Sequence, residues 1–548
     1  MKFSRLLGVA LLASMPFVSR AQQPDAGRIL DQLKQAPAIS VPKPPATRIE
    51  EKPRATVPSS GERFQVSRFQ FRGNAAFSEP VLLALIAEGQ GKSMTLGELN
   101  DLAERITRHY RDNGYILARA VIPSQDVTEG TVRIDVLEGL LGDIQISNPT
   151  GLSDSALAPL RQLRKGQALN RESLESAMLT IADLPGVDVR STLRPGTAIG
   201  ASDLLVDVAP GRRFSGGVDM DNFGSRATGG MRVGANFSFN NPLNLGDQIG
   251  LGFQTTEERL RYMRLSYQLP VGPYGTRLGV SHSDLHYRLG NDFAALNAEG
   301  DATVTSLSAT HPLLRSRATT VFASFQHNEK RLIDRVGATR TETSKKPSTN
   351  AVGVTANLLD GFWGGGSTYI NANYNFGKIS LDPTTAALDA ASAKTQGNFG
   401  STTLSMQRTQ NLSGNLGLFA SLNTQIAQKN LDSSEKFSLG GANGVRAYPQ
   451  GEGSGDEGRQ FTGELRWGFA PQWQAQAFYD HGQVKVNKNQ FAAGANLRHI
   501  WGYGLGLAHN NGSNLQVRGF LAWRGGEQRS VSDVDRLPRV WVQARYFF

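Results

Sequence analysis

Met231 to Phe239 read MRVGANFSF, nine residues in which apolar side chains alternate with polar or small ones. Successive side chains of a β-strand point to opposite faces, so one face of this segment is apolar and the other is polar. A turn sequence follows at once, from Asn241-Pro242 to Gly246-Asp247. The pattern therefore predicts a strand that turns one face toward an apolar environment.

Segments of this kind recur from Arg212 to Phe548, for example in FTGELRWGF at Phe461–Phe469. Strands with an apolar outer face and a polar inner face are typical of membrane β-barrels, in which every backbone group must be bonded within the bilayer. At roughly 21 residues per strand and turn, residues 212–548 give about 16 strands. The alternative, a soluble β-sandwich, would have to bury many polar inner faces. We predict a transmembrane barrel of 16 strands.

The composition agrees with an exported β-rich protein. Glycine makes up 60 of 548 residues, and the chain has no cysteine, which is compatible with an oxidising compartment. A formal net charge of +10 can indicate nucleic acid or an anionic membrane. The cations are scattered rather than gathered among aromatic residues, so we interpret them as surface and pore lining. Neither a nucleic-acid partner nor a cofactor is predicted.

Residues 1–21 resemble a secretory signal. Lys2 and Arg5 form a basic start, Leu6–Val18 is apolar, and Ser19 and Ala21 fit the small-residue rule at a cleavage site. A membrane anchor is the alternative, but the apolar run is short and contains a proline. No other run approaches 18 apolar residues, so no transmembrane helix is predicted.

Residues 22–36 are predicted to form a short amphipathic helix. Asp25 can cap it, and Ile29, Leu30 and Leu33 share one face. A frayed terminus is the alternative. Residues 37–62 contain six prolines without apolar periodicity, and we interpret them as a linker.

Residues 63–139 and 140–211 read as two similar α+β units of strand, helix, helix, strand and strand. FQFRGN begins at Phe69 and IQISNP at Ile144, while Leu99 and Ile106 recur as Leu174 and Ile181 with the same offset. A constant offset in two elements indicates tandem domains of one fold. In the first unit, Thr95 and Glu98 predict a capping box for the second helix.

A glycine-rich stretch, GGANGVRAYPQGEGSGDEG, runs from Gly440 to Gly458 and contains one arginine, Arg446. Alternation along Trp473–Gly482 directs Phe478, Asp480 and Gly482 into the lumen. An Arg–carboxylate pair can be bidentate and geometrically specific, so we predict that Arg446 is tied to Asp480 inside the barrel. On the alternative interpretation, Asp480 is one of many solvated pore charges. Two polar segments, Glu329–Asn350 and Leu381–Phe399, are predicted as extracellular loops.

Several motifs carry a family resemblance. Gly444–Pro449, with Arg446 and Tyr448, resembles the V-R-G-Y loop motif of two-partner secretion transporters, the haemolysin secretion/activation family of the POTRA-barrel superfamily. Phe478-x-Asp480-x-Gly482 is similar to their F-x-D-x-G strand motif, and Ile106–Asp126 resembles their first POTRA domain. The sequence departs from the pattern at Ala447, where the family usually has glycine.

The last strand also resembles the signal by which outer-membrane barrels are recognised for assembly. Val540, Val542, Ala544, Tyr546 and Phe548 share its lipid face, and the chain ends on the aromatic Phe548. The resemblance implies that Tyr546 and Phe548 engage the barrel assembly machinery.

As a whole, the resemblance implies a transporter in the bacterial outer membrane, in contact with its lipid, with two POTRA domains in the periplasm. These domains would recognise the secretion domain of a cognate exoprotein, such as a large β-helical adhesin, haemolysin or toxin. The exoprotein would then pass unfolded through the barrel. The resemblance also implies that the N-terminal helix is a plug in the resting pore.

Two other functions stay open: a barrel-assembly insertase of the same superfamily, and a passive porin. Enzyme motifs are absent from the sequence, which has no H-E-x-x-H, G-x-S-x-G or Walker loop. Ser433-x-x-Lys436 matches a Ser–Lys pattern without its companion motifs, and the eight histidines form no metal-spaced cluster. No catalytic or metal-binding residue is predicted.

Overall fold

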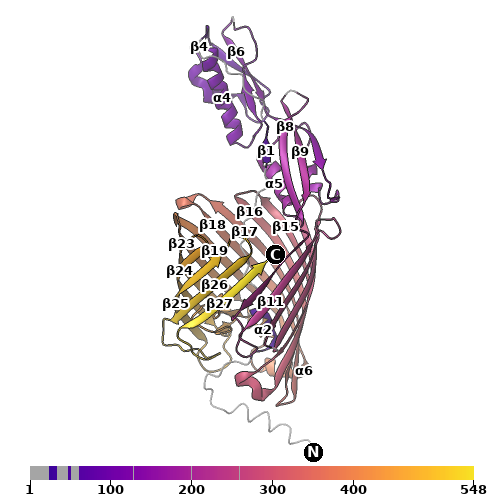
Figure 1. Cartoon of the computed structure of the whole chain (residues 1–548), viewed down its shortest axis with the longest axis vertical. Coiled ribbons are helices and arrows are strands. Elements are labelled where there is room, and N and C mark those ends of the chain that lie inside the picture. Colours follow the sequence, from indigo (N-terminus) through magenta and orange to yellow (C-terminus); the bar gives the residue numbers. More distant parts are fainter. Residues whose placement is uncertain (1–23, 34–46, 51–60, 128, 199, 258) are drawn as a thin grey trace, which may run out of the picture.

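The computed structural model describes residues 24–33, 47–50, 61–127, 129–198, 200–257 and 259–548. Two small α+β units stand in a row above one end of a large barrel (Figure 1). The predicted signal peptide lies outside the described residues, as does most of the predicted linker. In the part of the chain that the structure describes, no helix is long and apolar enough to cross a membrane.

The barrel consists of sixteen antiparallel strands, which confirms the predicted number. It is closed by pairing of the first strand, β10, with the last, β27. The strands are β10 (Phe214–Asp221), β11 (Arg232–Asn240), β12 (Gln248–Thr256), β13 (Leu260–Val271), β14 (Thr276–Arg288), β15 (Ala298–Arg315), β16 (Thr319–Val336), β17 (Thr341–Asp360), β18 (Gly366–Leu381), β19 (Gly397–Ser413), β20 (Leu416–Ala427), β23 (Glu457–Ala470), β24 (Trp473–Lys485), β25 (Leu497–Asn510), β26 (Leu515–Arg524) and β27 (Arg539–Phe547).

The alternation read from the sequence matches the two faces of the wall. Val233 and Phe237 of β11 are exposed on the outside. On β27, Val540 and Val542 are exposed whereas Trp541 and Gln543 are buried inside. The barrel is therefore a sheet with an apolar outer surface and a largely polar interior, as expected for a wall in contact with lipid.

One predicted extracellular loop is wrong. Glu329–Asn350 is mostly strand, because β16 and β17 continue as a hairpin that turns only at Gly337–Arg340. Most of its residues are polar or charged, and the apolar Leu332 and Ile333 are adjacent instead of alternating, so it lacks the apolar alternation that marks strands inside the bilayer. The other predicted loop, Leu381–Phe399, does connect two strands, and it contains a short helix, α6 (Pro383–Ala390).

The first unit follows the predicted order of elements. These are β2 (Arg63–Gln65), β3 (Arg68–Arg72), α3 (Glu79–Ile86), η1 (Ala87–Gly89), β4 (Ser93–Thr95), α4 (Leu96–Asp112), β5 (Arg119–Val121) and β6 (Thr131–Leu137). The Thr95–Glu98 capping box is present, with each side chain accepting the other residue's backbone N–H. Leu99, Ile106 and Tyr110 of α4 are buried against a sheet of order β3-β6-β5.

The second unit shares the framework but not the first helix. It contains β7 (Leu140–Ser147), η2 (Ala158–Gln162), α5 (Arg171–Ala182), β8 (Val187–Pro195) and β9 (Ala201–Pro210). Leu174 and Ile181 are buried, as are their counterparts Leu99 and Ile106 in the first unit. In place of a full α-helix before α5 stands the short 3₁₀ turn η2.

A short strand in the predicted linker was not expected. Thr47–Ile49 forms β1, which pairs in parallel with Ser191–Leu193 of β8 and gives a sheet of order β1-β8-β9-β7. An outer strand presents unpaired backbone groups, and β1 satisfies those of β8. The segment between the N-terminal helix and the first unit is therefore attached to the second unit on its way.

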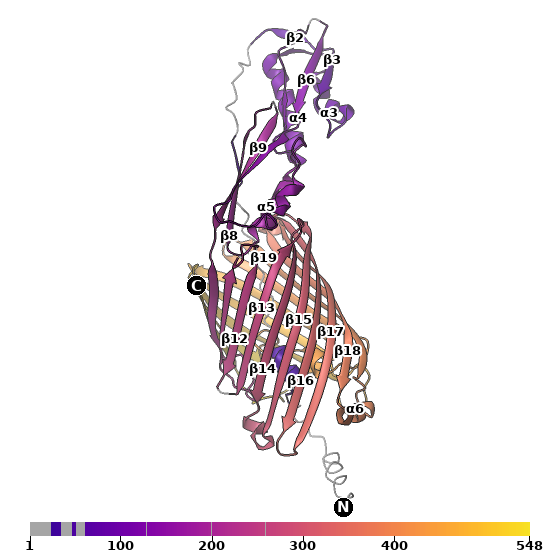
Figure 2. The same cartoon turned by 90° about the vertical axis from the view of Figure 1, so that its right-hand side faces the viewer.

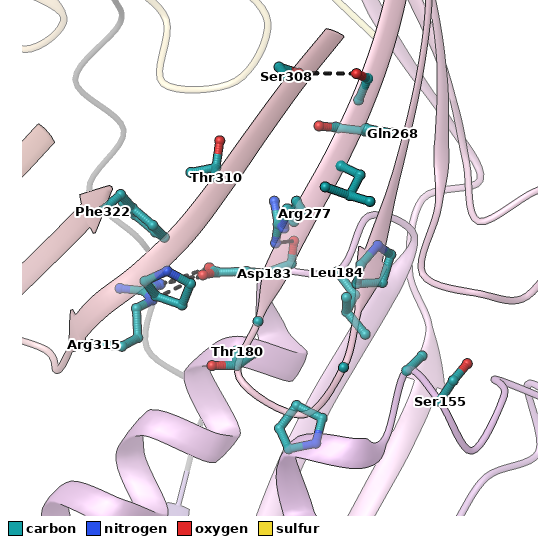
Figure 3. Close-up of a pocket in the computed structure, with 18 residues that line it drawn as sticks. Ser155, Thr180, Asp183, Leu184, Gln268, Arg277, Ser308, Thr310, Arg315 and Phe322 are labelled. Atoms are coloured by element: carbon teal, nitrogen blue, oxygen red, sulfur yellow. Dashed lines mark hydrogen bonds and ion pairs between the residues drawn. The ribbon is translucent and has the colours of Figure 1, made fainter. Parts of the chain in front are cut away.

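The second unit is fixed to the barrel by an ion pair at the end of α5 (Figure 3). Asp183 receives two hydrogen bonds from Arg315, at 3.0 Å from Nε and 2.8 Å from Nη2. Arg277 donates to the Asp183 carbonyl at 2.6 Å. The turn at Gly275 approaches α5 so closely that an added Cβ would lie 2.7 Å from Thr180. These contacts seat the unit on strands β13 to β16.

Candidate functional site: a loop held inside the barrel

Residues 439–453 form the inner loop, which folds back from the end of the barrel far from the two units. Its stem is a small hairpin of β21 (Phe437–Ser438) and β22 (Ser454–Gly455). Leu439 and Gly440 donate their N–H groups to Gly453 and Glu452 across the loop, at 3.0 and 2.9 Å. The glycine-rich stretch is thus a compact element with its own backbone hydrogen bonds.

The predicted pair of Arg446 and Asp480 forms in the structure. Nε and Nη2 of Arg446 donate to the two carboxylate oxygens of Asp480, each at 2.8 Å, and the Arg446 backbone N–H adds a third bond at 3.1 Å. Arg446 is 4% exposed and Asp480 is not exposed at all. Such a bidentate pair fixes both distance and orientation.

A second carboxylate, which the sequence did not single out, completes the site. Glu464 on β23 accepts from Nη1 of Arg446 at 2.7 Å and also binds Arg466, at 2.6 Å from Nη2. Thr462 donates to Asp480 at 2.9 Å. The buried cluster therefore contains two arginines and two carboxylates, so its charges balance.

Aromatic side chains enclose the guanidinium of Arg446. Its central carbon lies 3.5 Å from the ring centre of Phe478 and 5.1 Å from that of Phe520. The indole of Trp541 donates to the Arg446 carbonyl at 2.7 Å. A cation over an aromatic face is attracted by the ring electrons, most strongly when water is excluded. β24, β26 and β27 together thus hold the tip of the loop.

The remaining motif residues shape the space around the loop. Tyr448 is buried and donates its hydroxyl to the Gln528 carbonyl at 2.7 Å. A Cβ at Gly482 would lie 2.7 Å from Leu439 and 3.1 Å from Val445, so glycine lets the loop touch β24. Ala447 fits because it faces Gly502, which has no side chain. A Cβ at position 502 would lie only 2.4 Å from the Ala447 Cβ.

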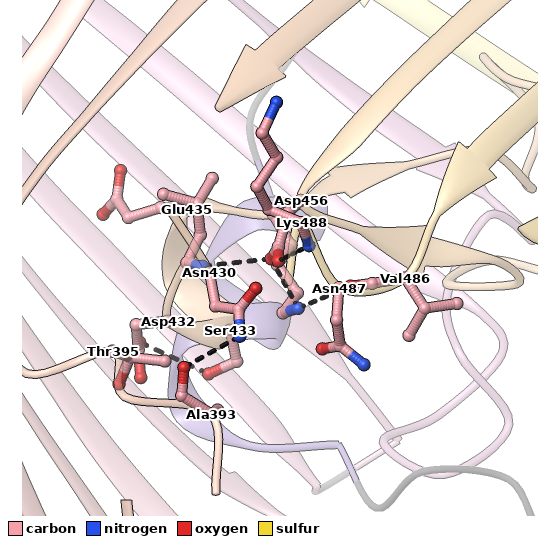
Figure 4. Close-up of polar contacts among 12 residues, drawn as sticks. Ala393, Thr395, Asn430, Asp432, Ser433, Glu435, Asp456, Val486, Asn487 and Lys488 are labelled. Atoms are coloured by element: carbon pink, nitrogen blue, oxygen red, sulfur yellow. Dashed lines mark hydrogen bonds and ion pairs between the residues drawn. The ribbon is translucent and has the colours of Figure 1, made fainter. Parts of the chain in front are cut away.

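Two more buried carboxylates anchor the rest of the loop and its stem. Glu452 binds Arg498 and accepts from the Ser532 N–H at 2.9 Å. Asp456 accepts from Lys436 Nζ at 2.6 Å and from the Lys488 N–H at 2.7 Å, in the network of Figure 4. The inner loop is therefore held at its tip, its middle and its stem.

The predicted N-terminal helix is α2 (Ala26–Gln32), and it lies inside the barrel (Figures 1 and 2). Asp25 caps it by accepting from the Arg28 N–H at 3.0 Å and also binds Lys345 at 3.1 Å. Ile29 is buried in an apolar cluster with residues of β13 to β16, and Leu30 and Leu33 pack against the same cluster. The helix is thus docked in the lumen rather than frayed.

Helix α2 also touches the inner loop and the 3₁₀ turn η5 (Ser433–Glu435). Arg28 donates to the Gly451 carbonyl at 3.2 Å. A Cβ at Gly27 would lie 2.7 Å from the Ser434 Cβ and 2.9 Å from its backbone nitrogen. Ser433 and Lys436 of the Ser-x-x-Lys pattern do not bind each other. Ser433 binds Asp25, whereas Lys436 binds Asp456.

Comparison with protein families identifies the fold. Residues 200–509 match the family described as haemolysin secretion/activation protein ShlB/FhaC/HecB, and residues 64–139 match its ShlB-type POTRA domain. The first match spans more than half of the chain. The chain belongs to this family. It is an outer-membrane β-barrel, and its POTRA domain lies on the side that is periplasmic in its relatives.

Relatives of the haemolysin secretion/activation family align along most of the chain. It is 27% identical to the heme/hemopexin transporter protein HuxB of Haemophilus influenzae (strain 86-028NP) over 515 residues, which cover 90% of each chain. It is 26% identical to the outer membrane transporter CdiB of Dickeya dadantii, over 82% of this chain and 80% of that one. The structure of CdiB from Escherichia coli superposes with a TM-score of 0.71 at 21% identity, covering 91% and 93% of the two chains.

Sequence reasoning missed Glu464, Thr462 and Trp541 as partners of Arg446. The alternation of apolar and polar residues had placed all three on inward faces, and this was the sequence signal that could have indicated contact with Arg446. Their contacts depend on strand register, which pairs Thr462 with Asp480 and Glu464 with Phe478. A face assignment alone does not supply that register.

Proposed function

We propose that this member of the haemolysin secretion/activation family exports one cognate exoprotein across the outer membrane. The observation that carries the proposal is the inner loop, held by Arg446, Asp480 and Glu464 in a sixteen-stranded barrel behind a POTRA domain. A passive porin needs neither that domain nor a buried charged lock. The exoprotein would pass through the barrel unfolded and fold outside.

We propose that residues 140–211 are a second POTRA domain and that the two domains bind the exoprotein's secretion domain. The family match to the first domain and the shared framework of the second unit support this assignment. Extended peptides bind such domains by adding a strand to an outer strand of the sheet. In the second unit β1 already covers β8, whereas β7 is an outer strand that exposes Ile146.

Further roles follow from the same proposal. Helix α2 acts as a plug through Ile29, Leu30 and Leu33, which is supported by its place in the lumen. Tyr546 and Phe548, exposed at the end of β27, are contacts for the barrel assembly machinery, and the apolar outer face contacts outer-membrane lipid. The protein works as a transporter and not as an enzyme.

Removing the gene and analysing the culture medium tests the proposed function. The partner is sought as a large β-helical exoprotein encoded beside this chain. Its disappearance from the medium, with other outer-membrane proteins at normal levels, is the expected result. A general loss of barrels would instead support the insertase, and unchanged secretion with reduced solute uptake would support the porin.

Deletion of residues 25–36 tests the plug. Single-channel conductance in planar lipid bilayers should rise when this segment is absent, because α2 no longer fills part of the lumen. Equal conductance of the deleted and intact proteins would rule the plug out.

A further inference from the structure

Six of the sixteen strands, β15 to β20, carry mostly hydroxyl and amide side chains on the lumen face and no charge over its middle. The structure describes every residue of β15 to β20. Lys330 on β16 and Lys345 on β17 point inward near the end of the barrel far from the two units. From there to the end near the two units, the inward positions of these strands are uncharged. Asn371, Asn373 and Asn375 on β18 are examples. We call the inward residues of this region the uncharged wall.

The side chains of the uncharged wall bind one another across strands. Ser306 donates to Asn328 at 2.8 Å, and Asn328 donates to Thr349 at 3.2 Å. On the next strand, Asn373 donates to Asn371 at 2.6 Å, and Asn371 donates to Thr355 at 2.8 Å. The wall is thus a continuous surface of neutral donors and acceptors.

The wall from β23 to β27 differs from the uncharged wall in charge and in occupancy. It carries the Arg446 cluster and is covered by the inner loop. A cavity of about 810 Å³ lies between β15 to β18 of the uncharged wall and the strands β10 to β14, where Asp219 and Arg264 line it, and Leu30 and Leu33 of α2 line it as well.

The chemistry of the uncharged wall fits a polypeptide in transit. Inward side chains repeat about every 7 Å along a strand, which is the side-chain repeat of an extended chain. Neutral hydrogen bonds are roughly half as strong as charge-assisted ones. Passage through a pore requires binding that is spread over many sites and weak at each.

We propose that the uncharged wall is the binding surface for the exported polypeptide, which crosses the barrel extended along β15 to β20. This inference rests on the proposed function as an exporter. The ligand class is an unfolded polypeptide, bound through its backbone amides and polar side chains whatever its sequence. The opposite wall, with the inner loop, does not contact the passing chain.

Two carboxylates placed on the uncharged wall test the inference. Asn373→Asp with Asn375→Asp adds charge at two inward positions of β18, of which Asn375 lines the cavity. Each would form charge-assisted bonds to a passing backbone, so export of the cognate exoprotein should slow about tenfold. The control is Gln474→Glu at an inward position of β24, compared with Asn375→Asp alone so that each variant carries one new charge; Gln474→Glu should export at the wild-type rate.

The outcomes separate the inference from the function that it rests on. If the wild-type protein secretes no exoprotein, the proposed function fails. If the wild type secretes it and the double variant does so equally well, the uncharged wall is not the path. Equal slowing by Gln474→Glu also overturns the inference, because the two walls would then be equivalent.

Two further measurements guard against a trivial loss of folding. Single-channel conductance of each variant establishes that its barrel has inserted. If the double variant does not insert, Asn375→Asp alone is used, since its carboxylate can accept from the Thr403 hydroxyl that now faces Asn375 at 3.5 Å.

Block of the channel by a peptide is a second test, made in proteins from which residues 25–36 have been deleted. A short unstructured peptide rich in serine and asparagine should block the channel only briefly when the uncharged wall is unchanged. Its block should last longer in the variant, and equal block times would contradict the inference.

Discussion

The inner loop and helix α2 both occupy the lumen, but they are attached in different ways. The loop and its stem are held by four buried carboxylates, Asp480, Glu464, Glu452 and Asp456, and the loop lies in an apolar cluster with Phe478, Phe520 and Trp541. Helix α2 has only seven residues; it is attached by the Asp25–Lys345 ion pair, by single hydrogen bonds such as that of Arg28 to Gly451, and by the apolar cluster around Ile29. The loop is thus part of the barrel's core, whereas α2 is a small element bound to the inner wall by fewer contacts.

Removing the arginine of the loop should have the largest effect. Arg446→Ala leaves Asp480 and Glu464 buried with one partner fewer, which costs about 3–5 kcal/mol. We expect an inserted barrel that unfolds at lower temperature and exports little. Thermal unfolding in detergent and the amount of exoprotein in the medium measure the two effects. Normal export would show that transport does not need the bonds of Arg446. The control is Arg459→Ala, at an exposed position on β23.

One methyl group under the loop should have the next largest effect. Gly482→Ala places a Cβ 2.7 Å from Leu439, and overpacking of this kind costs about 1–3 kcal/mol. Gly463→Ala on the neighbouring strand is the matched control, since its Cβ would meet only Phe461 at 3.4 Å. Thermal unfolding should separate the two variants. Equal stability would mean that the loop is not packed against β24.

For α2, a methyl group should release the helix and leave the barrel intact. In Gly27→Ala the new Cβ meets the backbone of Ser434 at 2.9 Å. In a helix that packs on nothing, the same change would be stabilising by about 0.5–1 kcal/mol. We therefore expect higher single-channel conductance with unchanged thermal unfolding. Lower conductance than wild type would place α2 away from η5.

The smallest effect is expected at the cap of α2. Asp25→Ala removes the cap and the bond to Lys345, for about 1 kcal/mol in helix docking. Asp25→Asn keeps a good cap but loses the charge, so it separates the two contributions. Conductance should rise less than in Gly27→Ala. A larger rise in Asp25→Asn than in Asp25→Ala would contradict this account.

The sequence predicted most of the barrel, because alternation over many strands is a strong and repeated signal. It also placed Asp480 inside and gave it Arg446 as partner. It did not place Glu464 beside them, since that contact needs the register between β23 and β24. Contacts that depend on which residues of two strands stand opposite each other are not encoded in the pattern of either strand alone.

Two other features escaped the sequence for physical reasons. The β16–β17 hairpin beyond Glu329 is mostly polar and its few apolar residues do not alternate, so its sequence does not distinguish its strands from a loop. Thr47–Ile49 is too short to show any periodicity, and it becomes a strand only because β8 offers unpaired backbone groups beside it. In both places the structure arises from a neighbouring strand and not from local preference.

Strand β1 also determines the length of the tether between α2 and the second unit. Thirteen residues, 34–46, join Leu33 at the end of α2 to Thr47, and a chain of that length reaches at most about 50 Å. If β1 separates from β8, the tether consists of residues 34–62, and its maximum extended length grows to about 100 Å. The three-residue pairing of Thr47–Ile49 with β8 thus limits how far α2 could move while the chain stays attached to the second unit.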